Sequence, residues 1–337
     1  MTPAAKAWAR FRRALPVAAA LVSCPCFAAP AALPAALWGK TALLGSSADK
    51  SVQAGRHGAC PEGQPDCRLG PNWNGDRQSL LPTGAALPGS IRSTTPRNGE
   101  KLIALTFDLC EMAGERAGYD ADIVNYLRQH EIRATFYAGG KWLRSHPEKA
   151  MQLMADPLFE IGNHGWRHRN MRRLNGREAE QEVLWTQAQY VLLRQELEAK
   201  AKAVGLRLPE LAPVPPSYRF PFGDCSPENL KLLQQLKLPA VQWSIVTGDP
   251  APAQDAKAIA TAVLGQAKPG SIVIAHANGK GWHTAEALPL FIPALEQQGY
   301  RFVTVSELLD AASQTEASPL CYESKPGDTA RYDRLGR

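Results

Sequence analysis

The chain has 337 residues, 45% of them hydrophobic, and a mean hydropathy of −0.27, which excludes a protein with many membrane spans. Its formal net charge is +6, but four cations lie within the first 13 residues, where no acid balances them: Lys6, Arg10, Arg12 and Arg13. The remaining 34 basic residues face 32 acidic ones, and a nucleic-acid-binding protein would keep a basic surface beyond such a segment. We therefore expect no nucleic-acid partner.

Residues 1–28 have the pattern of an export signal. The cations precede a nine-residue apolar run, residues 14–22, which is too short to span a membrane and is typical of the centre of a secretory signal. Two cleavage points fit equally well, because residues 21–24 resemble a bacterial lipobox while residues 26–28 suit an ordinary signal peptidase. Lipidation of Cys24 would attach the protein to a membrane. We expect a protein of the periplasm or cell envelope, or a secreted one; no pattern indicates its oligomeric state.

Residues 29–98 are rich in Ala, Gly, Pro and Ser and lack sustained periodicity, which predicts an extended N-terminal arm. Within it, Cys60 and Cys67 flank a polar stretch, and export would permit a local disulfide between them. A zinc clip is the weaker alternative, since neither cysteine has a second Cys or His at ligand spacing.

From Lys101 onward, short apolar runs alternate with longer amphipathic stretches, which is typical of an α/β fold with a mainly parallel sheet. We expect this domain over residues 99–312, followed by a C-terminal tail over 313–337. The longest helix is expected from Arg177 to about Ala203. Seven strands are expected: Leu102–Phe107, Ala134–Tyr137, Phe159–Gly162, Tyr218–Phe220, Val241–Ile245, Ser271–Ala275 and Phe302–Val305.

Polar side chains lie at or just beyond the ends of five of these strands, where an α/β barrel carries its chemistry. Each alone has an ordinary structural interpretation, such as a helix cap or a hydrogen-bonded core histidine. Their agreement in position indicates a site. The residues are Asp108, His164, His168, Arg219, Asp249 and His276.

His164 and His168 are separated by three residues, a spacing that would place both imidazoles on one side of a helical turn and suits a divalent cation. The pair does not belong to a zinc-protease helix, because no Glu follows His164. Two solvated histidines in a basic loop remain the alternative.

Taken together, these motifs resemble the polysaccharide deacetylases of the NodB homology type, carbohydrate esterase family four, over about residues 101–309. The resemblance implies a deformed seven-stranded (β/α) barrel. It rests on five motifs in order, with a closing helix and strand after them: residues 106–108, 164–168, 219–223, Asp249 and 272–276.

The resemblance also implies roles. A metal held by His164 and His168 would polarise an acetyl carbonyl and make water easier to deprotonate. Asp108 would act as general base and His276 as general acid. By the same resemblance, two further residues would orient them: Arg219 the base and Asp249 the acid.

One position departs from the family pattern. The first motif of the family has two adjacent aspartates followed by glycine, the second being a metal ligand, but here Asp108 precedes Leu109, Cys110 and Glu111. Three substitutes are open: Glu111 as the ligand, Asp108 itself, or the two histidines with waters. Imidazole ligation favours zinc as the single divalent ion, with cobalt, nickel or manganese as alternatives.

Further contacts are expected near the site. Phe222 and Trp243 could line a sugar site, although ordinary packing explains them equally well. Cys110 and Cys225 each follow a site motif closely, which favours a disulfide between them; Cys225 with Cys321 is the rival pairing.

The function implied is metal-dependent removal of N-acetyl groups from an N-acetylglucosamine-type polysaccharide of the envelope or extracellular space. The missing aspartate keeps open a non-catalytic glycan-binding protein on the same barrel. An amidase acting on a non-sugar substrate is a third interpretation. Peptidoglycan, chitin-like chains and poly-N-acetylglucosamine share the acetamide, so the residues do not select among them.

Overall fold

The computed structural model of the chain describes residues 32–54, 68–84 and 87–322. The predicted export signal with Cys24, and the predicted pair Cys60 and Cys67, lie outside these residues. Within the described parts, we find no helix with both the length and the apolar character needed to cross a membrane.

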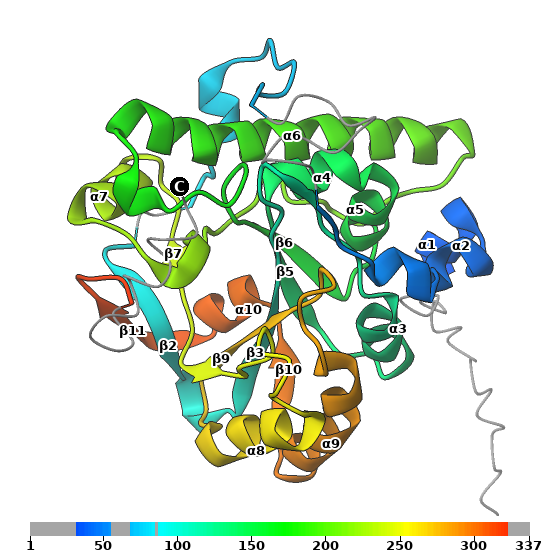
Figure 1. Cartoon of the computed structure of the whole chain (residues 1–337), viewed down its shortest axis with the longest axis vertical. Helices are drawn as coiled ribbons and strands as arrows, with labels where there is room; N and C mark the ends of the chain where they lie inside the picture. The colour runs from blue at the N-terminus through cyan, green and yellow to red at the C-terminus, as the bar shows by residue number, and fades with distance from the viewer. Residues whose placement is uncertain (1–31, 55–67, 85–86, 323–337) are drawn as a thin grey trace, which may run out of the picture.

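Helices and strands alternate along most of the described chain (Figure 1). The strands are β1 Gln53–Ala54, β2 Ser90–Pro96, β3 Leu102–Leu109, β4 Glu115–Arg116, β5 Ala134–Ala138, β6 Phe159–Asn163, β7 Ala240–Val241, β8 Ile245–Val246, β9 Ser271–His276, β10 Arg301–Val303 and β11 Ala312–Ser318. The helices are α1 Ala32–Trp38, α2 Lys40–Leu44, α3 Ala121–Gln129, α4 Gly140–Ser145, α5 Pro147–Met154, α6 Gly176–Ala203, α7 Pro227–Gln235, α8 Ala256–Gln266, α9 Thr284–Gln297 and α10 Val305–Asp310.

A curled, mainly parallel sheet forms the centre of the molecule. β3 runs parallel to β9 on one side and to β5 on the other, and β6 continues the sheet beyond β5. Isolated bridges join Tyr218 to Asn163 of β6 and to Ala240 of β7, and β7 pairs with β2. These links draw the two sides of the sheet toward each other, as in a deformed (β/α) barrel. The predicted fold class, an α/β fold with a deformed (β/α) barrel, is confirmed.

Burial on both faces explains why the central strands were recognisable. All eight residues of β3 are buried, and the ring of Phe107 stacks on that of Phe136 in β5 at 5.3 Å between centroids. Strands covered on both faces read as continuous apolar runs. Figure 1 shows helices around the sheet, with α6 along the top of the view and α8 and α9 at the bottom.

The predicted helix from Arg177 to about Ala203 is confirmed as α6, within one residue at its start. It begins where Asn175 accepts a hydrogen bond from the backbone N–H of Glu178 while the Glu178 side chain accepts from Asn175 N–H. This reciprocal cap satisfies two donors that a helix start leaves unpaired.

Several strands differ from those expected. β2 lies within the residues of the expected arm and pairs with β9 and β7, and β11 begins at the last residue of the expected domain and pairs with β2. Residues 218–220 contribute isolated bridges in place of a strand, and residues 241–245 are divided between β7 and β8. Among the described residues the main sheet therefore has nine strands, not seven.

Candidate active site

The predicted site residues meet at one edge of the sheet because they follow parallel strands. Asp108 near the end of β3 is the register partner of His276 at the end of β9. His164 directly follows β6, two strands away on the other side of β3. The carboxyl ends of parallel strands face the same way, so these side chains converge.

Asp108 is held by Arg219, which is fully buried. Arg219 Nη1 donates to Asp108 Oδ1 at 2.9 Å and to Thr106 Oγ1 at 2.7 Å, and its Nη2 donates to the carbonyl of Gln242 at 3.0 Å. The guanidinium carbon lies 4.0 Å from the ring centroid of Tyr137. This scaffold fixes the carboxylate in orientation. Burial opposes its ionisation, but the facing His164 and Arg219 outweigh burial and lower the pKa of Asp108.

The two histidines lie on a loop and not on the helical turn that their spacing predicted. His164 and Gly165 follow β6 directly, with Gly165 at φ +75° and His168 at φ +55°. The ring centroids of His164 and His168 are 5.0 Å apart. Burial lowers the pKa of His164 and lowers that of His168 well below its ordinary value, so both imidazoles are neutral near pH 7.

The tautomer of His164 follows from its partners. Its Nδ1 lies 2.9 Å from the carbonyl oxygen of Arg219, so Nδ1 carries the proton and Nε2 carries a lone pair. That Nε2 faces Asp108 Oδ2 at 3.4 Å, and among the described residues it has no hydrogen-bond partner. His168 Nδ1 is likewise buried without a hydrogen-bond partner in the described part of the chain. His164 Nε2 and Asp108 Oδ2 are both acceptors, and two acceptors that face each other indicate a place for a cation.

The metal expected from the sequence fits these atoms in part. Two ligands about 2.1 Å from one tetrahedral ion lie about 3.4 Å apart, which matches the separation of His164 Nε2 and Asp108 Oδ2. Within residues 32–54, 68–84 and 87–322, however, no three His, Cys, Asp or Glu side chains form a complete metal site. The chain presents two neutral imidazoles and a facing carboxylate, which form an incomplete ligand set.

A partly exposed His276 and a buried Asp249 form a dyad beside Asp108. His276 Nδ1 lies 3.0 Å from Asp249 Oδ1, and the His276 backbone N–H donates to Asp249 Oδ2 at 2.7 Å. Hydroxyls of Thr247 and Thr284 donate to the same carboxylate at 3.0 and 2.7 Å. Burial disfavours the charged imidazole, but Asp249, with Asp108, outweighs it and raises the pKa of His276.

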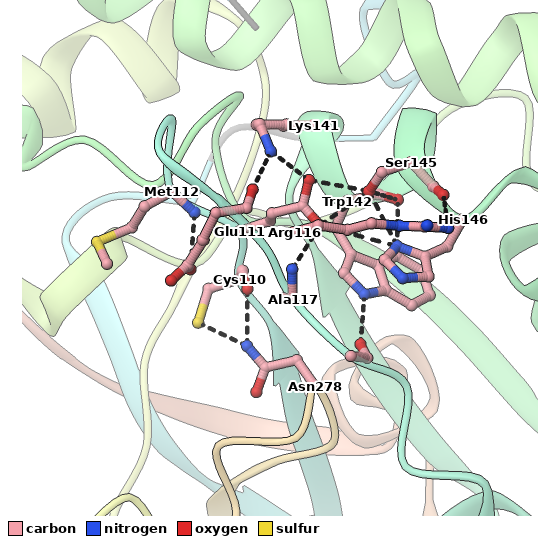
Figure 2. Close-up of polar contacts among 12 residues, drawn as sticks. Cys110, Glu111, Met112, Arg116, Ala117, Lys141, Trp142, Ser145, His146 and Asn278 are labelled. Carbon is pink, nitrogen blue, oxygen red and sulfur yellow. Dashed lines mark hydrogen bonds and ion pairs between the residues drawn. The ribbon is translucent and has the colours of Figure 1, made fainter. Parts of the chain in front are cut away.

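Glu111 lies in a different environment from the one predicted (Figure 2). Its carboxylate accepts from Lys141 Nζ at 2.5 Å, from the Ala117 backbone N–H at 2.9 Å and from Ser145 Oγ at 2.8 and 2.9 Å. It is fully buried, and burial raises its pKa, although Lys141 opposes this shift. These partners occupy the Glu111 carboxylate, so its role as the missing metal ligand stays a prediction that a measurement of metal affinity has to test.

The preferred disulfide is also wrong. Cys225 pairs with Cys321, the rival pairing, while Cys110 is a free, buried thiol. Asn278 Nδ2 donates to Cys110 Sγ at 3.0 Å and to its carbonyl at 2.7 Å (Figure 2). Burial raises the pKa of Cys110 to about 12, so the group is a neutral thiol.

The two predicted sugar-lining aromatics border the site unequally. The ring of Phe222 lies 4.4 Å from that of His168. The ring centroid of Trp243 lies 5.6 Å from the Arg219 guanidinium carbon. The ring of Tyr322, the residue after Cys321, stacks on the Trp243 ring at 4.8 Å between centroids. Their contact with a sugar stays a prediction.

Sequence reasoning assigned no role to several residues that support the site. A single sequence does not indicate which hydroxyl lies beside a buried charge, although Thr106 falls within the first motif. The supporting residues are Thr106, Tyr137, Asn163, Glu182, Thr247 and Thr284.

Comparison with known proteins extends this description. The family described as polysaccharide deacetylase matches residues 95–241. A peptidoglycan-N-acetylglucosamine deacetylase of Bacillus cereus is 30% identical over 236 residues, covering 69% of this chain and 97% of that protein. Other curated relatives are longer, and this chain spans 36% of one and 42% of another.

Solved structures of similar proteins lead to the same family. The Bc1960 peptidoglycan N-acetylglucosamine deacetylase has a TM-score of 0.55 at 26% identity, covering 66% of this chain and 94% of that one. A mutant of a CE4 family pseudoenzyme with restored enzymatic activity has a TM-score of 0.52 at 25% identity, covering 67% and 72%. Similar structures thus include both a deacetylase and a pseudoenzyme.

Proposed function

The chain belongs to the polysaccharide deacetylase family, carbohydrate esterase family 4, and from this premise we propose that it hydrolyses N-acetyl groups of an N-acetylglucosamine-type polysaccharide. The proposal includes one divalent ion, zinc first, with cobalt, nickel or manganese as alternatives. It also places the protein outside the cytoplasm, acting on an envelope or extracellular glycan. Similarity to a peptidoglycan-N-acetylglucosamine deacetylase along almost its whole length supports the substrate class.

One observation carries the proposal: the ring nitrogens of His164 and His168 that are buried without a hydrogen-bond partner among the described residues, beside Asp108. A buried polar atom without a partner is costly, so natural proteins rarely retain one without a use for it. These histidines would hold the ion. When bound, the ion would supply Lewis-acid polarisation of the acetyl carbonyl.

The chain's own residues supply the proton transfers. Asp108 accepts a proton from the attacking water, since its lowered pKa keeps the carboxylate ionised and Arg219 holds it in place. His276 delivers a proton to the departing amine nitrogen of the sugar, and Asp249 holds its ring by Nδ1, leaving Nε2 for the substrate. The side chain of His276 is 17% exposed, so it can reach a bound glycan.

Loss of catalysis is the second candidate, favoured by one specific position. Leu109 is fully buried at the place of the family's second aspartate, and Glu111 is engaged by Lys141. A chain with an incomplete ligand set could bind glycan without hydrolysing it. Metal content separates the two cases.

The first test measures metal and acetate together. Protein purified with zinc should contain about one ion per chain, release acetate from an N-acetylglucosamine polymer, and lose this activity in excess chelator. Return of activity with zinc or cobalt is expected. Metal-free protein that binds glycan without releasing acetate would establish the non-catalytic alternative.

A second test assigns the proton carriers. Asp108→Asn and His276→Ala should each lower kcat at least about 10²-fold. Asp122→Asn and His130→Ala, on the exposed side of α3 and at its end, are matched controls and should change kcat little. Metal content in Asp108→Asn decides between base and ligand, because loss of the ion in this variant would make Asp108 a ligand.

A further inference from the structure

The loop between the two histidines has an irregular backbone, yet that backbone is fixed from two sides. Gly165 at φ +75° and His168 at φ +55° show that no helix sets the separation of the rings. Something else must define that separation, since a metal site tolerates only small displacements of its ligands.

Carbonyl groups of the loop are held by α4. The backbone N–H of Gly140 donates to the carbonyl of Gly165 at 2.9 Å, and that of Lys141 donates to the carbonyl of Trp166 at 2.7 Å. A side chain at Gly140 would meet the Trp166 ring at 2.3 Å, so only glycine permits this approach. One side of the loop is thereby anchored.

The N–H groups of the loop are held by one carboxylate. Glu182 Oε2, on α6, accepts from the backbone N–H of Trp166 at 2.9 Å and of Arg167 at 3.0 Å. These are two successive N–H groups in the middle of the segment that joins His164 to His168. Asn163 Oδ1 accepts from Gly165 N–H at 2.9 Å, so three successive N–H groups have side-chain acceptors.

Glu182 is buried, so its contact with the loop N–H groups has to offset the desolvation of the carboxylate. Its side chain is 4% exposed, and the nearest cation, Arg167 Nε, is 3.7 Å from Oε1. A buried carboxylate is tolerated only when hydrogen bonds and charge compensate its desolvation. Charge-assisted bonds from the two N–H groups, which are stronger than neutral ones, supply part of that compensation, although burial still raises the pKa of Glu182.

We propose that Glu182 is a positioning residue for the histidine pair, because its carboxylate fixes the two peptides between His164 and His168. This inference rests on the proposed metal site. Glu182 acts through the loop backbone. Its carboxylate contacts the loop peptides and touches neither the ion nor the substrate.

Variants at Glu182 separate geometry from charge. Glu182→Gln keeps an acceptor oxygen at the same reach, Glu182→Asp keeps the charge but withdraws it by one methylene, and Glu182→Leu removes the acceptor. Glu198→Asp, an exposed residue of the same helix, is the matched control.

The experiment measures zinc affinity of the full chain by competition with a chromogenic chelator. We expect the Asp and Leu variants to bind zinc at least about tenfold more weakly, as is typical of lost support around ligands, and the Gln variant within about threefold of wild type. Hydrogen exchange of metal-free protein should accelerate at the amides of Trp166 and Arg167 in the same two variants.

Each outcome of this experiment supports or overturns the proposal. Wild-type affinity in Glu182→Asp and Glu182→Leu would overturn the proposal. Loss of affinity in Glu182→Gln, with affinity kept in Glu182→Asp, would assign the effect to charge and overturn it too. If Glu182→Leu does not fold, the zinc affinities of the Asp and Gln variants still test the proposal. Absence of zinc uptake by the wild-type chain would reject the metal site itself, whereas zinc uptake with unaltered variants rejects only the role of Glu182.

Discussion

The ion pair of Glu111 and Lys141 is a structural contact in the interior. Both side chains are almost completely buried, and Lys141 also donates to the backbone carbonyl of Glu115. Removing one partner of such a pair strands a charge and costs about 3–5 kcal/mol. Glu111→Leu should therefore lower the free energy of unfolding by about this amount, measured by urea titration, and leave zinc affinity of the folded protein unchanged.

The double variant Glu111→Leu with Lys141→Met is the control for that interpretation. It removes both charges, so much of the lost stability should return. A tenfold loss of zinc affinity in Glu111→Leu, with stability kept, would contradict the structural assignment and return Glu111 to the metal site.

The dyad of His276 and Asp249 predicts a pH dependence. Asp249 raises the pKa of His276 against the effect of burial, so the ring stays protonated to higher pH than an ordinary histidine. Asp249→Asn should lower that pKa, and the high-pH limb of kcat/KM should move to lower pH. A pH profile measures this; an unmoved high-pH limb would show that His276 is not the acid that governs it.

Prediction from sequence succeeded at residues whose position follows from strand order. Asp108, His164 and His276 could be brought together because each lies at a strand end. The partner of Glu111 could not be predicted, since Lys141 lies on α4, 30 residues away, and a lysine is almost never fully buried. The i, i+4 spacing misled for a related reason: Gly165 ends the regular backbone after β6.

At the scale of elements, the junction of α4 and α5 carries a buried neutral histidine. His146 stacks on Trp142 at 4.9 Å and lies 2.9 Å from Ser145 Oγ. Burial, with Arg116 and Lys141, lowers its pKa from 6.5 to about 4, although Asp49 opposes the shift. Between these pH values the unfolded chain binds a proton that the native state does not.

Stability should therefore be fully present above about pH 6.5 and fall as the pH drops toward about 4. The loss amounts to about 3 kcal/mol at most. His146→Gln should flatten this part of the pH dependence in urea unfolding, while His130→Gln, an exposed histidine at the end of α3, should not. Parallel pH profiles for wild type and His146→Gln would contradict the assignment.

Strands differ in how readily the sequence reveals them. β3, β5 and β9 are buried on both faces and read as apolar runs. β2 buries residues irregularly, and β11 is exposed along most of its length, so neither has a continuous apolar pattern. β2 and β11 are strands because they pair with each other. The two segments lie more than 200 residues apart, and the local sequence pattern does not encode a contact of that range.

At the scale of the whole molecule, the disulfide between Cys225 and Cys321 closes a long loop. The two cysteines are 96 residues apart, and chain-entropy arithmetic gives about 4.7 kcal/mol for a loop of this size. Replacing both by serine should cost about 2–5 kcal/mol in the free energy of unfolding. Reduction of the wild-type protein should give at least this loss, measured in guanidinium chloride, because it would also break the predicted Cys60–Cys67 disulfide.

A local consequence accompanies that loss. Tyr322 stacks on Trp243 and its backbone N–H donates to the Gly223 carbonyl at 2.9 Å, so release of Cys321 should loosen this stack and change the tryptophan fluorescence. Cys110→Ser is the control, since its thiol makes no disulfide among the described cysteines. A disulfide-linked peptide containing Cys110 in a non-reducing digest would contradict the pairing.

The pairing of β11 with β2 has a consequence for the order in which the fold can be completed. β2 is an inner strand between β9 and β11, and its partner on one side is synthesised 222 residues after it begins. A chain that emerges from its N-terminus exposes the outer edge of β2 until residues 312–318 arrive. Contacts of such sequence separation slow folding, and an uncovered strand edge invites pairing with other chains.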